Sequence, residues 1–117
     1  MIFKFISMSP FGYIKVAWPP LIPRTYIDET DKEITVCFEI PGVKKEDINL
    51  YASEHYLRLK AKVPEDVSKK LFKPKEYRKT VFLPTPVDPE NAKSKYENGI
   101  LTVTLPKKVP GKRILIE

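Results

Sequence analysis

The sequence is poor in the residue types that most often carry catalysis or bind metals. It contains one cysteine, one histidine and four glycines among 117 residues. The lone Cys37 excludes an internal disulfide, so a cytoplasmic location is expected rather than a secreted disulfide framework. His55 falls in a predicted turn, no cluster has metal-ligand spacing, and there is no glycine-rich phosphate loop. We therefore expect no enzyme activity, no small-molecule substrate, no cofactor and no metal site.

Long apolar runs are missing as well. Lys15, Pro19 and Pro20 interrupt the apolar beginning of the chain, which stays short of the roughly 18 residues that a membrane-spanning helix needs. Pro10 ends the opening segment, and no small-residue cleavage site follows it. Neither a membrane span nor a signal peptide is expected.

Uninterrupted stretches long enough for a stable helix are scarce, because 12 prolines are spread along the chain. Short strands fit the gaps between these prolines, and the length suits one domain. We expect an apolar N-terminal arm at residues 1–24, a β domain at residues 25–106 and a C-terminal tail at residues 107–117.

Apolar and polar residues alternate in several short segments. In residues 33–40, Ile34, Val36 and Phe38 alternate with polar side chains, which is the two-residue period of a half-buried strand. Similar runs begin at Tyr26 and recur at residues 48–52, 57–63, 77–83, 92–96 and 101–105, with turn signals between them. About seven such strands predict an all-β, immunoglobulin-like sandwich of two antiparallel sheets.

Residues 64–76 interrupt this rhythm with prolines and many lysines. They predict a loop longer than a hairpin needs, and loops of that length are usually functional or disordered. At the other end, a basic and flexible tether at residues 107–113 leads to Ile114, Leu115 and Ile116. In a strand, the two isoleucines would point the same way and could enter pockets at a groove or sheet edge.

The arm at residues 1–24 is rich in apolar side chains but shows no clean strand or helix period. Two interpretations stay open. The arm could pack on its own domain as an ordinary N-terminal strand, or it could be an adaptable surface that binds other proteins.

Three motifs, in order and correctly spaced, resemble the small heat shock proteins and their α-crystallin domain. Residues 94–101 resemble the signature Ala-x-x-x-Asn-Gly-Val-Leu, with Ser94 in place of the usual alanine and Ile100 in place of valine. Residues 41–48 resemble the family's Pro-Gly segment, and residues 114–116 match its C-terminal Ile-x-Ile motif. The resemblance covers about residues 25–117.

The resemblance implies an ATP-independent holding chaperone that binds non-native proteins, suppresses their aggregation and works as a homo-oligomer built from dimers. It implies that subunits pair by passing the 64–76 loop, with Leu71 and Phe72 as its apolar anchor, to a partner's sheet. Larger oligomers would form through Ile114 and Ile116.

Further site residues follow from the resemblance. The groove that receives the C-terminal motif is expected between the strands at residues 48–52 and 92–96, with Leu50 and then Ile48 as its lining. Lys79 is implied at the dimer interface, although a lysine that reaches solvent at a sheet rim remains an alternative. Non-native clients would contact the aromatic residues of the arm, namely Phe3, Phe5, Phe11, Tyr13 and Trp18.

Two other functions remain as alternatives. One is a co-chaperone of the CS-domain type that acts as a monomer, which the long loop and the Ile-x-Ile motif disfavour. The other is a basic β protein that binds single-stranded nucleic acid, because the net charge is +6. Most of the basic surplus in residues 60–79 lies in the loop without the interleaved aromatics that stack bases, so no nucleic acid is expected.

One compositional bias concerns the source. Glutamine is absent, while lysine and glutamate are plentiful. Hyperthermophilic proteins tend to show this bias, which predicts a thermophilic microbe.

Overall fold

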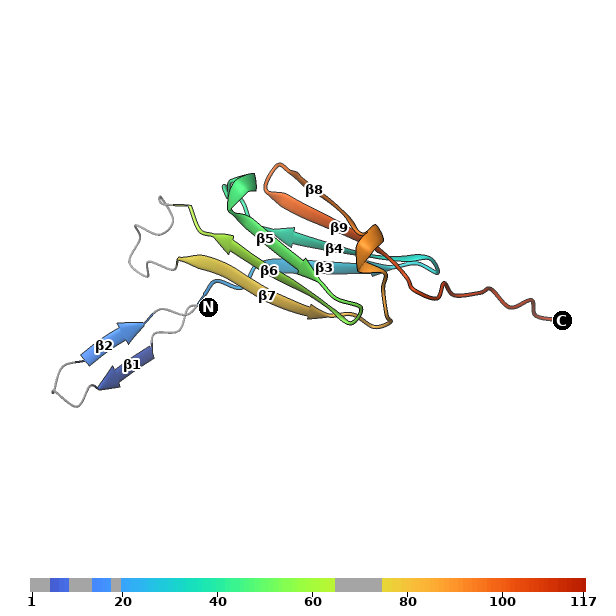
Figure 1. Cartoon of the computed structure of the whole chain (residues 1–117), viewed down its shortest axis with the longest axis horizontal. Coiled ribbons are helices and arrows are strands. Elements are labelled where there is room, and N and C mark those ends of the chain that lie inside the picture. Colours follow the sequence, from blue (N-terminus) through green and yellow to red (C-terminus); the bar gives the residue numbers. More distant parts are fainter. Residues whose placement is uncertain (1–4, 9–13, 18–19, 65–74) are drawn as a thin grey trace.

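The computed structural model describes residues 5–8, 14–17, 20–64 and 75–117. Its strands are β1 (Phe5–Met8), β2 (Ile14–Ala17), β3 (Arg24–Glu29), β4 (Glu33–Glu39), β5 (Ile48–Ala52), β6 (Tyr56–Lys62), β7 (Glu76–Phe82), β8 (Lys93–Glu97) and β9 (Ile100–Pro106). Two short 3-10 helices, η1 (Lys45–Asp47) and η2 (Pro89–Asn91), precede β5 and β8 (Figure 1). The described part of the chain contains no α-helix, in keeping with the many prolines.

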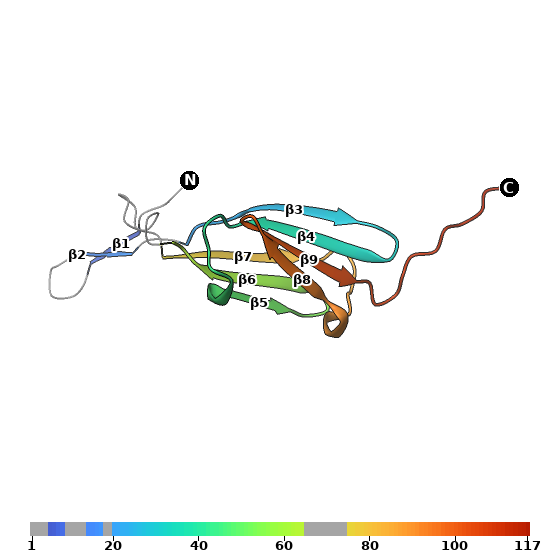
Figure 2. The same cartoon turned by 90° about the horizontal axis from the view of Figure 1, so that it is seen from above.

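The strands β3 to β9 form two antiparallel sheets packed face to face, which confirms the predicted sandwich. One sheet has the order β3-β4-β9-β8 and the other β5-β6-β7. In Figure 2, β3 and β4 of one sheet lie above β5 and β6 of the other, and β8 and β9 pass across the view between them. The predicted strands match the observed ones to within about one or two residues at each end.

The core lies between the central strands of the two sheets. In β4, Ile34, Val36 and Phe38 are fully shielded from solvent, and β9 places Leu105, Val103 and Leu101 directly opposite them. The facing sheet contributes the inward side chains Leu57, Leu59, Ala61, Tyr77 and Val81. Each fully buried aliphatic side chain stabilises the fold by about 1.5 to 3 kcal/mol, so this two-residue pattern determines which face of each strand is buried.

Two features of the fold were not predicted from the sequence. The strands β1 and β2 pair as an antiparallel hairpin, with Phe5 opposite Ala17 and Met8 opposite Ile14. Strands of four residues are too short for a period of two to stand out in a segment in which most residues are apolar. Val87, in the proline-rich connector before η2, is also fully buried as part of the hydrophobic core, and its backbone bridges to Lys107 just after β9.

The turn between β8 and β9 depends on a glycine. Asn98 and Gly99 both have positive φ values, 52° and 78°, as hairpin turns of type I′ require. A Cβ atom at Gly99 would lie 2.9 Å from the Cα atom of Pro41, which follows β4. This position therefore combines a left-handed conformation with close contact to a neighbouring backbone.

The Gly99→Ala substitution is expected to destabilise the fold by about 1 to 3 kcal/mol, because it adds both backbone strain and a steric clash. Thermal unfolding followed by circular dichroism at fixed protein concentration measures the effect. The matched control is Gly111→Ala. An added Cβ at this position would lie 3.6 Å from its nearest neighbour, which is an ordinary contact distance, and Gly111 does not have a positive φ. Equal melting temperatures for the two variants would contradict the role given to Gly99.

Candidate functional site

An open groove of about 360 Å³ lies where the edge strands β5 and β8 of the two sheets approach each other. Ile48 and Leu50 line it from β5, and both side chains are half-buried because they continue the inward face of that strand. The remaining lining residues come from η1, β8 and β9, namely Lys45, Ser94, Lys95, Tyr96 and Leu101. The structure thus places both sequence-predicted groove residues in one concave surface, where apolar side chains from β5 and β9 are flanked by polar residues of η1 and β8.

Tyr96 is a groove residue that the sequence did not reveal. Its hydroxyl lies 2.7 Å from the carbonyl oxygen of Val43 and 3.0 Å from that of Ile40, and it donates its hydrogen to them. A phenol is a neutral donor at physiological pH, and partial burial raises the pKa of Tyr96 further above that range. The ring therefore fixes β8 against the segment that follows β4, and it forms one wall of the groove. The signal that could have identified Tyr96 as a groove residue was its pairing with Leu101 across the β8–β9 hairpin.

The C-terminal isoleucines do not lie in this groove. Ile114 is 83% exposed and Ile116 is 93% exposed, and the last residues extend away from both sheets (Figure 1). Leu115 between them is equally exposed. Three large aliphatic side chains in a row remain in contact with water, although each would gain stability on burial.

The beginning of the tail, which the sequence predicted as part of a flexible tether, makes backbone hydrogen bonds to the domain. The Lys107 amide donates to the Lys32 carbonyl oxygen over 2.8 Å, and the Gly111 amide donates to the Asp31 carbonyl oxygen over 2.7 Å. Both acceptors lie in the turn between β3 and β4. Sequence periodicity could not show this contact, because it joins residues about 75 to 80 positions apart in the chain.

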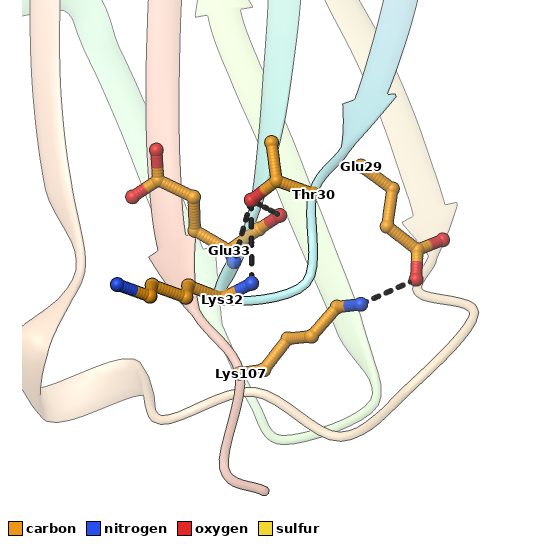
Figure 3. A network of polar contacts seen from close by, with 5 residues as sticks. All are labelled: Glu29, Thr30, Lys32, Glu33 and Lys107. Carbon is orange, nitrogen blue, oxygen red and sulfur yellow. Dashed lines mark hydrogen bonds and ion pairs between the residues drawn. The ribbon is translucent and has the colours of Figure 1, made fainter. Parts of the chain in front are cut away.

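Side chains reinforce this attachment, as Figure 3 shows. The Lys107 ammonium lies 2.6 Å from a carboxylate oxygen of Glu29, and the Lys107 side chain is only 10% exposed. The Thr30 hydroxyl accepts from the amides of Lys32 (3.3 Å) and Glu33 (3.1 Å), which holds the turn in shape. We call residues 107–111 and their contacts with the β3–β4 turn the tail anchor.

Lys108 extends the tail anchor to a second loop. Its amide donates to the Pro86 carbonyl oxygen over 2.9 Å, and its ammonium pairs with Glu54 in the β5–β6 turn. The hydrogen bond from Lys108 lowers the pKa of Glu54, and the same bond raises the pKa of Lys108. Both side chains are well exposed, so solvent screening leaves this pair only a minor contribution.

The strand β3 leaves one edge of its sheet open. Within the described residues β3 pairs only with β4, and its side chains Tyr26 and Ile27 are about half exposed, at 53% and 51%. An edge with unpaired amide and carbonyl groups is a template for a strand from another chain. On the other sheet, Leu21 bonds to β7 on both sides, which covers the start of that edge.

Lys79 is half-buried on the inward face of β7 between Tyr77 and Val81, opposite Leu59 in register. This is the phase expected from the sequence. Several other predicted site residues lie outside the described residues, namely Leu71 and Phe72 of the loop and Phe3, Phe11, Tyr13 and Trp18 of the arm. Phe5 belongs to β1, whose backbone alone is described.

The residues considered for catalysis lie apart from one another. His55 is exposed in its turn, and the Cys37 sulfur lies 3.8 Å from the Thr102 hydroxyl on the outer face of the β4–β9 pair. Among residues 20–64 and 75–117, no three His, Cys, Asp or Glu side chains gather in a way that could hold a metal ion. No helix in the described chain has the length and apolarity to cross a bilayer.

Comparison with known proteins identifies a family and several individual proteins that this chain resembles. Residues 26–117 match the Hsp20/alpha crystallin family. Small heat shock protein C2 of Rickettsia felis is 32% identical over 120 residues, which cover 97% of this chain and 78% of that protein. Heat shock protein 16 of Schizosaccharomyces pombe is 27% identical over 112 residues, covering 88% of this chain and 78% of that protein.

A solved structure shares the fold. Heat shock protein 16.0 from Schizosaccharomyces pombe superposes with a TM-score of 0.67 at 28% identity, over 84% of this chain and 77% of that one. The matched family region contains the groove, the open edge of β3, the tail anchor and the C-terminal isoleucines.

The Lys107→Met substitution is expected to loosen the tail anchor, because it removes the ion pair with Glu29 while keeping the length of the side chain. Loss of roughly 1 kcal/mol would speed amide hydrogen exchange at Gly111 about fivefold. Lys112→Met, in the exposed residues after the anchor, is the control and should leave this rate unchanged. Unaltered exchange at Gly111 in Lys107→Met would show that the ion pair does not hold the tail.

Proposed function

The chain belongs to the Hsp20/alpha crystallin family, and from that membership we propose that it is an ATP-independent holding chaperone working as a homo-oligomer built from dimers. The match of residues 26–117, which reaches through the C-terminal isoleucines, is the observation that carries this proposal. Its clients are non-native proteins, recognised by exposed apolar surface rather than by a defined sequence.

The C-terminal isoleucines are proposed to dock into the groove between β5 and β8 of another subunit. Ile114 and Ile116 are two residues apart, so in an extended tail both side chains point to the same side, about 6.8 Å apart. The groove offers Ile48, Leu50 and Leu101 as apolar partners. Burying each isoleucine would contribute about 1.5 to 3 kcal/mol, before the entropy cost of ordering the tail. The tail leads away from its own domain (Figure 1), which favours a groove on a different subunit.

Dimers are proposed to form through the open edge of β3. The 64–76 loop of one subunit, with Leu71 and Phe72, would add a strand beside β3 of its partner. The exposed Tyr26 and Ile27 would then be covered, and the free amide and carbonyl groups of β3 would be paired. Lys79 would lie near this interface, on the inward face of β7.

The apolar arm is proposed as the main client-binding surface. Its aromatic residues Phe3, Phe5, Phe11, Tyr13 and Trp18 can repack around many partners.

We also propose that the protein works in the cytoplasm of a thermophilic microbe. The cytoplasmic location rests on its single cysteine, and the thermophilic source rests on a composition that is rich in lysine and glutamate and lacks glutamine.

Replacing both isoleucines, Ile114→Ser and Ile116→Ser, is expected to lower the native mass toward that of a dimer, because the docking contacts are lost. Size-exclusion chromatography with light scattering measures the mass, and far-ultraviolet circular dichroism checks that the β-sandwich is intact. Leu115→Ser is the matched control, because Leu115 points to the opposite side of an extended tail. A double variant with the mass of the unmodified oligomer would refute the docking proposal, and a monomeric parent protein would favour the CS-domain alternative.

Deleting residues 1–20 is expected to weaken the suppression of client aggregation, because the aromatic surface is removed. The cut leaves Leu21, which bonds to β7, in place. Light scattering of a heat-denatured client without ATP measures protection, and the native mass of the truncated protein separates lost client binding from lost assembly. Full protection by the truncated protein would exclude the arm as the main binding surface.

A further inference from the structure

The outer face of the β5-β6-β7 sheet gathers cations and aromatic rings that lie apart in the sequence. Side chains alternate across a strand, so the residues that do not enter the core share this face. They include Tyr51 of β5, Tyr56, Arg58, Lys60 and Lys62 of β6, and Arg78, Thr80 and Phe82 of β7. We call this set the outer-sheet face. None of these residues lines the groove between β5 and β8.

Aromatic rings occupy one end of the outer-sheet face. Tyr56 lies directly opposite Phe82 in the β6–β7 register, and the ring centroids of Tyr51 and Tyr56 are 5.9 Å apart with an interplanar angle of 33°. Phe82 is 77% exposed and Tyr51 is 57% exposed. Their surfaces are therefore available to a flat partner in solution instead of being used in the core.

Cations occupy the middle of the same face. Lys60 lies opposite Arg78, and Arg58 lies opposite Thr80, in successive rows across β6 and β7. The Arg58 guanidinium carbon lies 5.1 Å from the centroid of the Tyr56 ring, which joins the cationic rows to the aromatic end. These four residues, together with Leu59 and Lys79, line a hollow of about 390 Å³.

Glu76 is an acidic residue among these cations. Its carboxylate lies 2.7 Å from Arg78 and 3.7 Å from Lys60. Both cations remain more than half exposed, at 57% and 56% of their side chains, so these ion pairs are screened by water and exchange readily. A phosphate group could replace the carboxylate on the same two cations.

We propose that the outer-sheet face binds single-stranded nucleic acid, with phosphates on Arg58, Lys60, Lys62 and Arg78 and bases stacked on Tyr51, Tyr56 and Phe82. Proteins that bind single strands combine a basic surface with exposed aromatic side chains in this way. Successive outer residues of a strand are about 6.8 Å apart, so the rows present rings and cations in register along the sheet. A duplex keeps its bases stacked internally and cannot use the rings.

This inference goes beyond the proposed chaperone function and does not depend on it. It revises the expectation of no nucleic acid, which rested on basic residues lying in the loop without interleaved aromatics. Folding supplies the aromatics from elsewhere: Tyr51 precedes the β5–β6 turn, Tyr56 follows it, and Phe82 comes from β7. The net charge of +6 adds long-range attraction for a polyanion.

The test is fluorescence anisotropy of the full-length protein with labelled oligouridylate and oligodeoxythymidylate of about 12 nucleotides, a length within the usual site size. A duplex of the same length is the comparison, and the salt concentration is varied. Both single strands should bind more tightly than the duplex. Four phosphate contacts predict a slope of log affinity against log salt of about −2.8, from roughly 0.7 per contact.

Matched variants assign binding to this face. Lys60→Gln with Lys62→Gln should weaken binding and make the slope shallower by about 1.4, because two contacts are lost. Lys32→Gln with Lys93→Gln removes the same charge from exposed positions away from this face, one in the β3–β4 turn and one in β8, and should change the slope little. Tyr51→Leu with Phe82→Leu should weaken binding roughly tenfold at unchanged slope, through loss of stacking. Glu76→Gln should strengthen binding severalfold, because a competing carboxylate is removed.

Several results would overturn the proposal. These are no binding to either single strand at 50 mM salt, equal losses for the two lysine pairs, or unchanged affinity after both aromatic substitutions. Heparin competing as well as the oligonucleotides at equal charge would identify a polyanion surface without base recognition. Circular dichroism and native mass confirm that each variant is folded and assembled. Because the arm, groove and tail are unmodified, client protection in the same variants reports on the chaperone function separately.

Discussion

Burial of one face of each sheet against the other is the constraint on which the rest of the structure depends. The central strands β4, β9 and β6 satisfy it with side chains that are almost wholly shielded from water. The edge strands β3, β5, β7 and β8 satisfy it only in part, and their unused surface remains open. The groove, the free edge of β3 and the outer-sheet face all remain accessible because a two-layer sandwich covers only the inner face of each sheet.

The sequence predicted correctly which face of a strand a residue occupies. The groove itself was implied by the family resemblance, which proposed Ile48 and Leu50 as its lining, and the structure places both residues there. Strand alternation alone placed Lys79 on the same face as Tyr77. The sandwich itself followed from these alternating runs. The turn between β8 and β9 could also be predicted, since Asn98 and Gly99 adopt the positive φ values that an Asn-Gly pair favours.

Contacts between residues distant in sequence could not be predicted in this way. The Tyr96 hydroxyl contacts carbonyl oxygens that are 53 and 56 residues away in the sequence. Lys107 contacts Glu29, which lies near the other end of the domain sequence. The aromatic end of the outer-sheet face likewise exists only after β6 and β7 have paired. Periodicity reports which face a residue occupies, but it does not report which residues of neighbouring strands become adjacent on that face.

The tail anchor limits the geometry of any assembly that uses the C-terminal isoleucines. The last anchored residue, Gly111, is three positions before Ile114, and an extended chain of that length spans at most about 10 Å. While the anchor holds, a receiving groove must therefore begin within that radius of the β3–β4 turn. A short tether raises the effective concentration of the isoleucines at grooves in that position and lowers it elsewhere, which selects a narrow set of subunit arrangements.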